Sequence, residues 1–223
     1  MGGTTYNFSY DGAGNPVYYK NQTLTWQNGR QLASYGSNIS YTYDYAGNRT
    51  SKTVNGIETY YMLEGGRILA EQTGSYETWY FYDESGVCGM HYANGYYLFE
   101  KNIFGDIVAI YNMGTGALVG EYTYDAWGNI LTATNNAVTN ANPFRYRGYY
   151  YDTETSMYYL NSRYYDPEIC RFISPDNPAN LLTESSTSFG ANLYQYAYNN
   201  PYAVWCAGLC CFRGGGWGGG SLA

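Results

Sequence analysis

Aromatic and polar residues alternate along most of the chain. The alternation is clearest in the segments 40–43 (Ser-Tyr-Thr-Tyr), 78–82 (Thr-Trp-Tyr-Phe-Tyr) and 121–124 (Glu-Tyr-Thr-Tyr). A period of two is typical of a β-strand that packs one face and leaves the other in water. No segment shows a helical period over the length of an ordinary helix. The pattern therefore predicts an all-β fold made of strands joined by turns.

The alternating segments end at a recurring motif. Tyr-Asp-x-x-Gly-Asn occurs at 10–15, 43–48 and 124–129, a shorter copy occurs at 82–86, and a degenerate copy (Asn-Ile-Phe-Gly-Asp) occurs at 102–106. Internal repeats of this kind indicate a repeat architecture. The expected turn residues are Asp11, Gly14, Asn15, Asp44, Gly47, Asn48, Asp83, Gly86, Asp125, Gly128 and Asn129.

Each residue of the motif has a mechanical role in a tight reversal. The Asp carboxylate can accept hydrogen bonds from backbone amides two residues further on, and the Gly-Asn pair is expected to supply left-handed backbone conformations. A second strand follows the turn, as in 49–54 (Arg-Thr-Ser-Lys-Thr-Val), so each unit is predicted to be a β-hairpin. Successive units would form a long antiparallel meander.

The chain divides into three parts by composition. Residues 1–142 carry the repeats, with 135–142 expected to be a loop between hairpins. Residues 143–205 are denser in aromatics, and we predict two strands, 143–152 and 157–167, on which Arg145, Arg147 and Arg163 stack among the rings. Residues 206–223 are rich in Gly and Cys, lack alternation, and are expected to be disordered.

Composition supports β-structure and excludes some classes of partner. With 31 Tyr, 28 Gly and 13% charged residues, the chain packs with aromatic rings, which favour half-buried pleated surfaces. A net charge of −7 and only 11 Lys and Arg argue against a nucleic-acid partner. No apolar run is long enough to span a membrane, and residues 1–5 lack the features of a signal peptide.

Candidate chemistry is sparse. The 5 cysteines form no regular framework and their odd number leaves a free thiol. His91 is the single histidine, and Cys206, Cys210 and Cys211 match no zinc-site spacing, so neither a metal nor a cofactor is expected.

The order of motifs resembles that of the Rhs repeat-associated core domain and of the YD-repeat shells that teneurins also carry. The resemblance covers nearly all of residues 5–205. It rests on the repeats followed by the segments 158–167, 171–176, 192–196 and 199–201. The core-motif residues in these segments are Arg163, Tyr164, Tyr165, Asp166, Pro167, Arg171, Phe172, Asn199, Asn200 and Pro201.

The resemblance implies a spiral β-shell of a secreted or cell-surface bacterial polymorphic toxin. In such proteins the core domain closes one end of the shell and precedes a C-terminal toxin. The expected partners are therefore further YD repeats of a larger shell, or an encapsulated toxin. Because residues 1–5 do not look like a signal peptide, accumulation in the cytoplasm is the alternative localisation.

The chain departs from the family where many members carry an aspartic autoprotease. Asp176 matches the first carboxylate of that pair, but Cys206 stands where the second is expected, after Asn199-Asn200-Pro201. An aspartic pair needs two carboxylates that share a proton. Asp176 is therefore expected to be a vestige or a turn residue, and the chain is not expected to be an enzyme. Cys170 stands where the family usually has Gly, which predicts a turn at 168–170 that is either strained or rearranged.

Two hypotheses for function follow, from different classes. In the first, the chain is a structural encapsulation module, either the C-terminal end of a toxin-carrying shell or a truncated remnant of one, and it buries one tyrosine face against a cavity. In the second, exposed rows near Trp79 and Trp127 bind a cell-surface carbohydrate or partner, because flat aromatic faces suit sugar rings. Residual self-cleavage through Asp176 ranks third. Open sheet edges also predict weak self-association.

Overall fold

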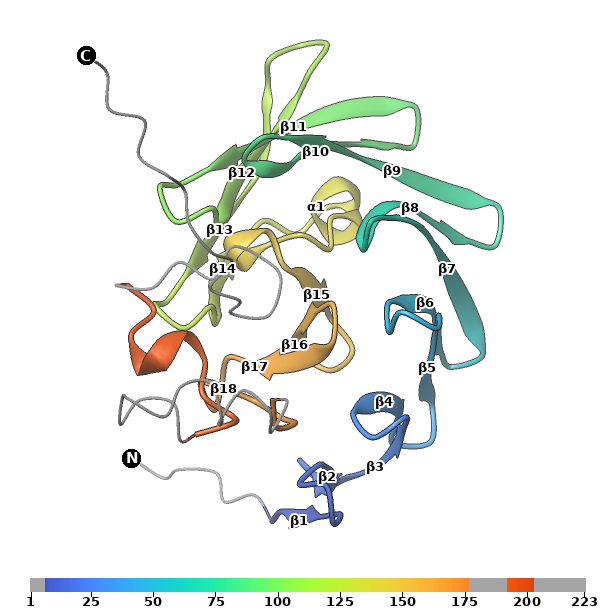
Figure 1. Cartoon of the computed structure of the whole chain (residues 1–223). Helices are drawn as coiled ribbons and strands as arrows, with labels where there is room; N and C mark the ends of the chain where they lie inside the picture. Colours follow the sequence, from blue (N-terminus) through green and yellow to red (C-terminus); the bar gives the residue numbers. More distant parts are fainter. Residues whose placement is uncertain (1–6, 177–191, 203–223) are drawn as a thin grey trace, which may run out of the picture.

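The structure is a computed structural model that describes residues 7–176 and 192–202. Fourteen strands form one antiparallel sheet in sequence order, and four later strands form a second sheet, also in sequence order (Figure 1). We call the first sheet the wall and the second the core sheet. The predicted all-β fold, an antiparallel hairpin meander, is confirmed.

The wall consists of β1 (Ser9–Tyr10), β2 (Pro16–Tyr19), β3 (Gln22–Gln27), β4 (Gln31–Tyr35), β5 (Ile39–Tyr43), β6 (Arg49–Val54), β7 (Ile57–Glu64), β8 (Arg67–Thr73), β9 (Tyr76–Asp83), β10 (Gly86–Tyr92), β11 (Gly95–Lys101), β12 (Ile107–Asn112), β13 (Leu118–Tyr124) and β14 (Ile130–Ala133). The core sheet consists of β15 (Tyr150–Asp152), β16 (Met157–Leu160), β17 (Arg163–Asp166) and β18 (Arg171–Phe172).

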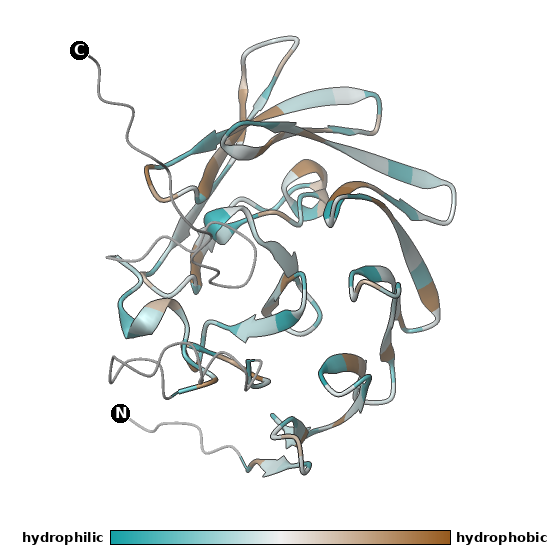
Figure 2. Cartoon of the chain, in the orientation of Figure 1, coloured by the Kyte–Doolittle hydropathy of each residue, from teal (hydrophilic) through white to brown (hydrophobic). Residues whose placement is uncertain are grey.

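The alternation along the sequence sorts side chains onto the two faces of the wall. In β9, Thr78 and Tyr80 are buried whereas Trp79 and Phe81 are exposed. Most of the wall is pale or teal in Figure 2, because tyrosine, threonine and glutamine fill its strands more often than aliphatic residues. Buried tyrosine rings therefore supply much of the packing on the inner face.

The wall curves around the core sheet, which lies against its concave side (Figure 1). One hydrophobic cluster joins the two sheets: it contains Tyr41, Tyr61 and Tyr80 from the wall together with Tyr150 and Tyr164 from the core sheet. The expectation that a shell fragment buries its tyrosine face against a cavity is wrong for these residues. They pack instead on the chain's own later strands.

The core sheet is buried on both faces. Its second face carries Tyr158, Tyr165 and Phe172, which pack against Tyr146 and Tyr196 in a separate cluster. All four residues of β17 are buried. The aromatic density of this part of the sequence therefore reflects a strand layer enclosed from two sides.

The loop predicted at 135–142 contains a short helix, α1 (Ala137–Ala141). Asn136 and Thr139 form a capping box, in which the Asn136 side chain accepts from the Thr139 amide and the Thr139 hydroxyl accepts from the Asn136 amide. The same Asn and Thr residues that suggest a loop are good N-terminal caps. The Tyr122 hydroxyl donates to the Thr139 carbonyl at 2.8 Å, which fixes the helix against the wall.

The two strands predicted in 143–167 are only partly right. Within 143–152 just β15 is a regular strand, because η1 (Tyr146–Gly148), a 3-10 turn with Arg147 at φ +52°, interrupts it. The segment 157–167 forms two strands, β16 and β17. Arg145 and Arg147 therefore do not lie on strands, although their guanidinium groups do face rings, as with Arg145 at 4.9 Å from the Tyr122 centroid.

The predicted disordered tail, 206–223, lies outside the described residues, and so do Cys206, Cys210 and Cys211. A second 3-10 turn, η2 (Ala197–Asn199), ends the described chain near residue 202. Within 7–176 and 192–202, no helix has the length and apolarity needed to cross a bilayer.

Candidate functional site at the interface of wall and core sheet

The Tyr-Asp-x-x-Gly-Asn motif forms a five-residue corner between strands. In the copy at 44–48, the Asn48 amide donates to Asp44 Oδ1 at 2.8 Å, and Asn48 Nδ2 donates to Asp44 Oδ2 at 3.0 Å. Gly47 has φ +88° and donates its amide to the Asp44 carbonyl at 3.1 Å. Only the glycine is left-handed; the asparagine instead clamps the aspartate, which corrects the expectation that both residues turn the chain.

Other copies repeat this corner, with one informative variation. Asp11 with Asn15, and Asp125 with Asn129, make the same side-chain pair. At 102–106 the two residues have exchanged places: Asn102 Nδ2 donates to Asp106 Oδ2 at 2.6 Å, and the Asp106 amide donates to Asn102 Oδ1 at 3.0 Å. At the shorter copy Asp83 caps Ser85, and Gly86 has φ +104°.

A shift in strand register precedes each five-residue corner and sets the direction of the side chain that follows. Between Thr42 and Tyr43 the pairing slips, so that Tyr43 lies opposite Arg49. Both side chains then point to the concave face, because directly opposed residues share one face of a sheet. The corner thereby places Arg49 inside the molecule.

Arg49 and Asp152 form an ion pair in which both side chains are fully buried. Arg49 Nη1 lies 2.5 Å from Asp152 Oδ2, and Nη2 lies 3.1 Å from Oδ1. Lys52 adds a second cation, with Nζ at 2.9 Å from Asp152 and 2.8 Å from Glu154. Burial alone would raise the pKa of Asp152, but the charges of Arg49 and Lys52 hold it below its ordinary value.

Five tyrosine rings surround the Arg49 guanidinium. Its central carbon lies 4.3 to 5.9 Å from the ring centroids of Tyr159, Tyr150, Tyr61, Tyr41 and Tyr164. Cation–π attraction is strongest for such desolvated cations. The rings come from β5 and β7 of the wall and from three strands of the core sheet, so the guanidinium joins the two sheets.

Glu71 extends this polar cluster along the wall. Its carboxylate accepts hydrogen bonds from the hydroxyl groups of Tyr80 and Tyr150, both at 2.7 Å. Burial raises the pKa of Glu71 above its ordinary value, even though the hydroxyl groups lower it. A carboxylate is thus held between wall and core sheet in a partly desolvated state.

A second anchor lies where Asp166 ends β17, as Asp152 ends β15. Lys20 Nζ lies 2.6 Å from both Asp166 and Glu168, and the Tyr19 hydroxyl also donates to Asp166. The pattern matches the first anchor, since Asp166-Pro167-Glu168 and Asp152-Thr153-Glu154 are both Asp-x-Glu segments whose Asp is the last residue of a core strand. Sequence reasoning missed Lys20, Arg49, Lys52 and Asp152. Alternation could have signalled Lys52, which lies opposite the inward Tyr41, whereas Arg49 is turned inward by the register shift, which alternation does not show.

Asp176 is held by Arg163. Arg163 Nη2 lies 3.2 Å from the Asp176 carboxylate, and the guanidinium carbon lies 3.6 Å from the centroid of the Phe172 ring. The Asp176 amide donates to the Leu193 carbonyl at 2.9 Å. Cys206, at the position expected for a second carboxylate, lies outside the described residues.

The remaining core-motif residues fasten the core sheet to the last corner of the wall. The Tyr165 hydroxyl donates to the Trp127 carbonyl at 2.8 Å, and Asn129 donates to the Pro167 carbonyl at 3.1 Å. Pro201 accepts from Arg147. Other sequence-predicted residues have local roles: Tyr164 shares a hydrogen bond with Tyr43, Arg171 pairs across strands with Asp166, and Asn199 and Asn200 donate within η2.

Cys170 has φ +58°, the left-handed conformation expected where a glycine is usual. Its thiol donates to the Pro167 carbonyl at 3.5 Å. Burial raises the pKa of this thiol, so the ionised form is disfavoured. The residue is therefore a turn former with a neutral side chain.

The two tryptophans of the carbohydrate hypothesis lie in different surroundings. Trp79 is 39% exposed on the outer face, where Ala70 and His91 are its cross-strand neighbours. Trp127 is partly buried against the second aromatic cluster. No group of three His, Cys, Asp or Glu suited to a metal occurs in the part of the chain that the structure describes.

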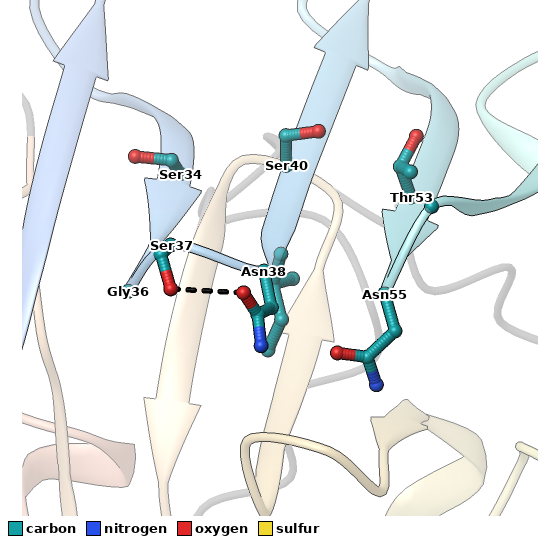
Figure 3. A pocket seen from close by; sticks show the side chains of 9 residues that line it. Ser34, Gly36, Ser37, Asn38, Ser40, Thr53 and Asn55 are labelled. Carbon is teal, nitrogen blue, oxygen red and sulfur yellow. Dashed lines mark hydrogen bonds between the residues drawn. The ribbon is translucent and has the colours of Figure 1, made fainter.

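An open pocket of about 480 Å³ lies on the wall where the β4–β5 and β6–β7 turns meet (Figure 3). Ser34, Ser40, Thr53 and Asn55 contribute polar groups, and a 2.8 Å hydrogen bond joins Ser37 and Asn38. Ser34, Ser40 and Thr53 lie directly opposite one another across three strands. The pocket carries no charged side chain and no large aromatic ring.

Comparison with known proteins agrees with this architecture. The chain is 35% identical over 207 residues to the tRNA3(Ser)-specific nuclease WapA of Bacillus spizizenii, covering 87% of this chain and 9% of that protein. It is 27% identical over 204 residues to human Teneurin-4, covering 87% and 7%. The double-stranded DNA deaminase toxin A of Burkholderia cenocepacia is 42% identical over 89 residues, covering 39% and 6%. The chain thus spans less than a tenth of these relatives.

Solved structures share the fold. TcdB2-TccC3 superposes with a TM-score of 0.66 at 20% identity, over 87% of this chain and 11% of that one. The Tc holotoxin pore of Photorhabdus luminescens gives 0.61 at 17% identity, over 87% and 10%. The sequence profile of the teneurin YD-shell family matches residues 1–202. With its hairpin wall, its repeated Asp-to-Asn corners and this match over most of its length, the chain belongs to the teneurin YD-shell family.

Proposed function

We propose that this chain is the closing end of a toxin-carrying YD shell, in which the core sheet plugs the last turns of the wall. The observation that carries the proposal is the Arg49–Asp152 pair, because it fixes the core sheet against the concave face with both side chains buried. A plug held in this way separates the inside of a shell from the solvent. On this proposal 1–142 are shell repeats and 143–205 are the closing region, a division supported by the change of sheet between β14 and β15.

The module acts structurally and not as an enzyme. The ion pair to Arg163 gives the Asp176 carboxylate a role in holding β17 to the chain near residue 176. The nuclease and deaminase named among the relatives are far longer than this chain, which covers 9% and 6% of them. The proposal therefore assigns it the carrier part of such a protein, with further repeats and a C-terminal toxin as partners.

A chimera tests the proposal. Residues 7–202 would replace the matching segment of the Bacillus spizizenii nuclease, and external protease would be added to the purified protein. We expect the segment C-terminal to the graft to stay protected, and to become cleavable in the same chimera with Asp152→Ala. Equal cleavage of both chimeras, at the rate of the urea-unfolded protein, would refute the role of a plug.

A carbohydrate-binding face is the second candidate, and the surroundings of its two tryptophans weaken it. Trp79 is available on the outer face, whereas Trp127 packs against Tyr146 and its neighbours. The polar pocket of Figure 3 offers hydroxyl and amide groups but no ring on which a sugar could stack. Binding on a glycan array that is lost in Trp79→Ala would favour this candidate.

A further inference from the structure

The outer face of the wall differs sharply between its two halves. From β3 to β6 one outward row consists of Thr25, Ser34, Ser40 and Thr53, which lie opposite one another on successive strands. The Thr25 and Ser34 hydroxyl groups are 2.6 Å apart. This half presents hydroxyl groups to water, as the outer face of a soluble sheet normally does.

From β7 to β13 the outer face is apolar instead. Strand register aligns two neighbouring rows, because directly opposed residues point to the same side. We call these two rows the outer patch; the first is Met62, Ala70, Trp79, His91 and Tyr96, and the second is Phe81, Gly89, Leu98, Tyr111 and Leu118.

The large side chains of the outer patch are well exposed and in contact with one another. Trp79, Phe81, Leu98, Leu118, Met62 and Tyr96 are between 39% and 54% exposed. The Phe81 and Tyr96 rings stack at 6.1 Å, and the His91 ring lies 4.6 Å from that of Tyr96. Contiguous exposed apolar surface rimmed by polar residues marks an interaction site.

Carboxylates border the outer patch on both sides. On one side, Glu77 lies two residues before Trp79 on the same face of β9. On the other side, Glu100 lies two residues after Leu98, and Glu100 and Glu121 both lie opposite Ala109. All three glutamates are exposed. An apolar centre with an acidic rim is complementary to a partner that has an apolar centre and a basic rim.

We propose that the outer patch docks a protein segment that carries large apolar residues flanked by Lys or Arg. The exposed aliphatic side chains of Met62, Leu98 and Leu118 suit a protein better than a sugar, which needs flat rings. The acidic rim and the net charge of −7 disfavour an anionic membrane and a second copy of this chain. The inference stands independently of the plug.

A random-peptide library displayed on phage provides the probe. We expect selection on the intact chain to enrich peptides with two or more large apolar residues beside Lys or Arg. The synthetic form of an enriched peptide should bind at least about tenfold more weakly to Phe81→Ser and to Leu98→Ser. It should also lose affinity for Glu100→Lys combined with Glu121→Lys, and with added salt.

Ile103→Ser is the matched control, because Ile103 is 90% exposed and lies outside both rows. It should bind the peptide as wild type does, and circular dichroism would show that each variant keeps its strands. Two independent patch variants guard against one that fails to fold. The docking proposal is overturned by no enrichment above the empty matrix, by peptides without basic residues, or by binding that survives both patch substitutions.

Two further measurements would replace the proposed partner with another. Light scattering that shows a dimer lost in Phe81→Ser would identify a second copy as the occupant, whereas association through open sheet edges would persist in that variant. Glycan binding that disappears in Trp79→Ala would identify a carbohydrate. Either result overturns the docking of a basic protein segment.

Discussion

The guanidinium of Arg49 and the carboxylate of Asp152, 103 residues apart in the sequence, meet in two hydrogen bonds of 2.5 and 3.1 Å. Arg49 follows a corner of the wall and Asp152 ends the first strand of the core sheet. Most other contacts of the wall join neighbouring strands. This pair, with Lys52 beside it, is a fully buried anchor between the two sheets, and the Lys20–Asp166 pair is a second anchor.

Removing one partner of the pair should destabilise the whole chain. Asp152→Ala leaves Arg49 buried without its carboxylate, and the free energy of unfolding should fall by about 3–5 kcal/mol. Urea denaturation followed by circular dichroism measures the loss. Asp83→Asn is the control, because Asp83 is exposed and its pair with Lys101 spans 3.5 Å, so its effect should stay below about 1 kcal/mol. Equal effects of the two substitutions would show that the buried pair has no special weight.

The corners should depend on the backbone conformation of their glycine. Gly47 has φ +88° and only the Gln31 amide near the position of a Cβ, at 3.4 Å, so Gly47→Ala should cost roughly 1–2 kcal/mol from conformational strain. Gly12 has open space and no left-handed φ, so Gly12→Ala should be close to neutral. Thermal unfolding of both variants checks the difference, and a neutral Gly47→Ala would contradict this account of the corner.

The Glu71 carboxylate should make stability rise as the solution becomes mildly acidic. Because burial raises its pKa in the folded chain, the folded state takes up a proton before the unfolded state does, whose pKa is about 4.3. Stability then increases as pH falls from neutral toward the unfolded value. Comparing denaturation midpoints of wild type and Glu71→Gln between pH 7 and 4.5 isolates this part, which should be absent in the variant.

The contribution of Asp152 to the pH dependence of stability has the opposite sign, and it should be the larger contribution in strong acid. Its folded pKa is lowered, so its contribution is present above the unfolded value of about 3.9 and is lost as pH falls through the folded pKa. In Asp152→Asn the acid-induced loss of stability below pH 4 should become shallower. An unchanged slope in that variant would assign acid unfolding to other carboxylates.

Self-cleavage should not occur through Asp176. Its carboxylate pairs with Arg163 at 3.2 Å, and the sequence offers Cys206 where a second carboxylate would be needed. Intact-mass spectrometry of wild type and Asp176→Asn after long incubation should show one full-length species in each. A shortened product in wild type alone would restore the autoprotease hypothesis.

Local patterns were enough to predict hairpins and corners of the wall, but not the division of 143–167 into strands. Alternation in 78–82 and the Asp-to-Gly-Asn motif each depend on near neighbours, and the structure contains both. The prediction that the asparagine adopts a left-handed conformation is wrong. Asn48 instead hydrogen-bonds to the Asp44 side chain, a contact that exists only once the turn has formed. The helix at Ala137–Ala141 was missed because capping residues and loop residues have the same composition.

The meeting of the two sheets could not be predicted in the same way. Nothing near Arg49 in the sequence identifies Asp152 as its partner, and the ring cage around it assembles from five strands. The inward position of Arg49 depends on the register shift at its corner, which alternation along the sequence does not show, and its neighbours depend on the curvature of the wall. Long-range polar contacts of this kind cannot be predicted from the local pattern of hydrophobic and polar residues.

The order of strands along the wall has a consequence for biosynthesis. Each strand from β1 to β13 pairs with the next strand in the sequence. Each hairpin can therefore form as soon as the ribosome has released its two strands. The tyrosine side chains of the inner face then remain exposed to solvent until residues 150–172 have been synthesised and cover them. We expect nascent chains stalled before Tyr150 to bind chaperones strongly, and nascent chains long enough to include β17 to bind them weakly.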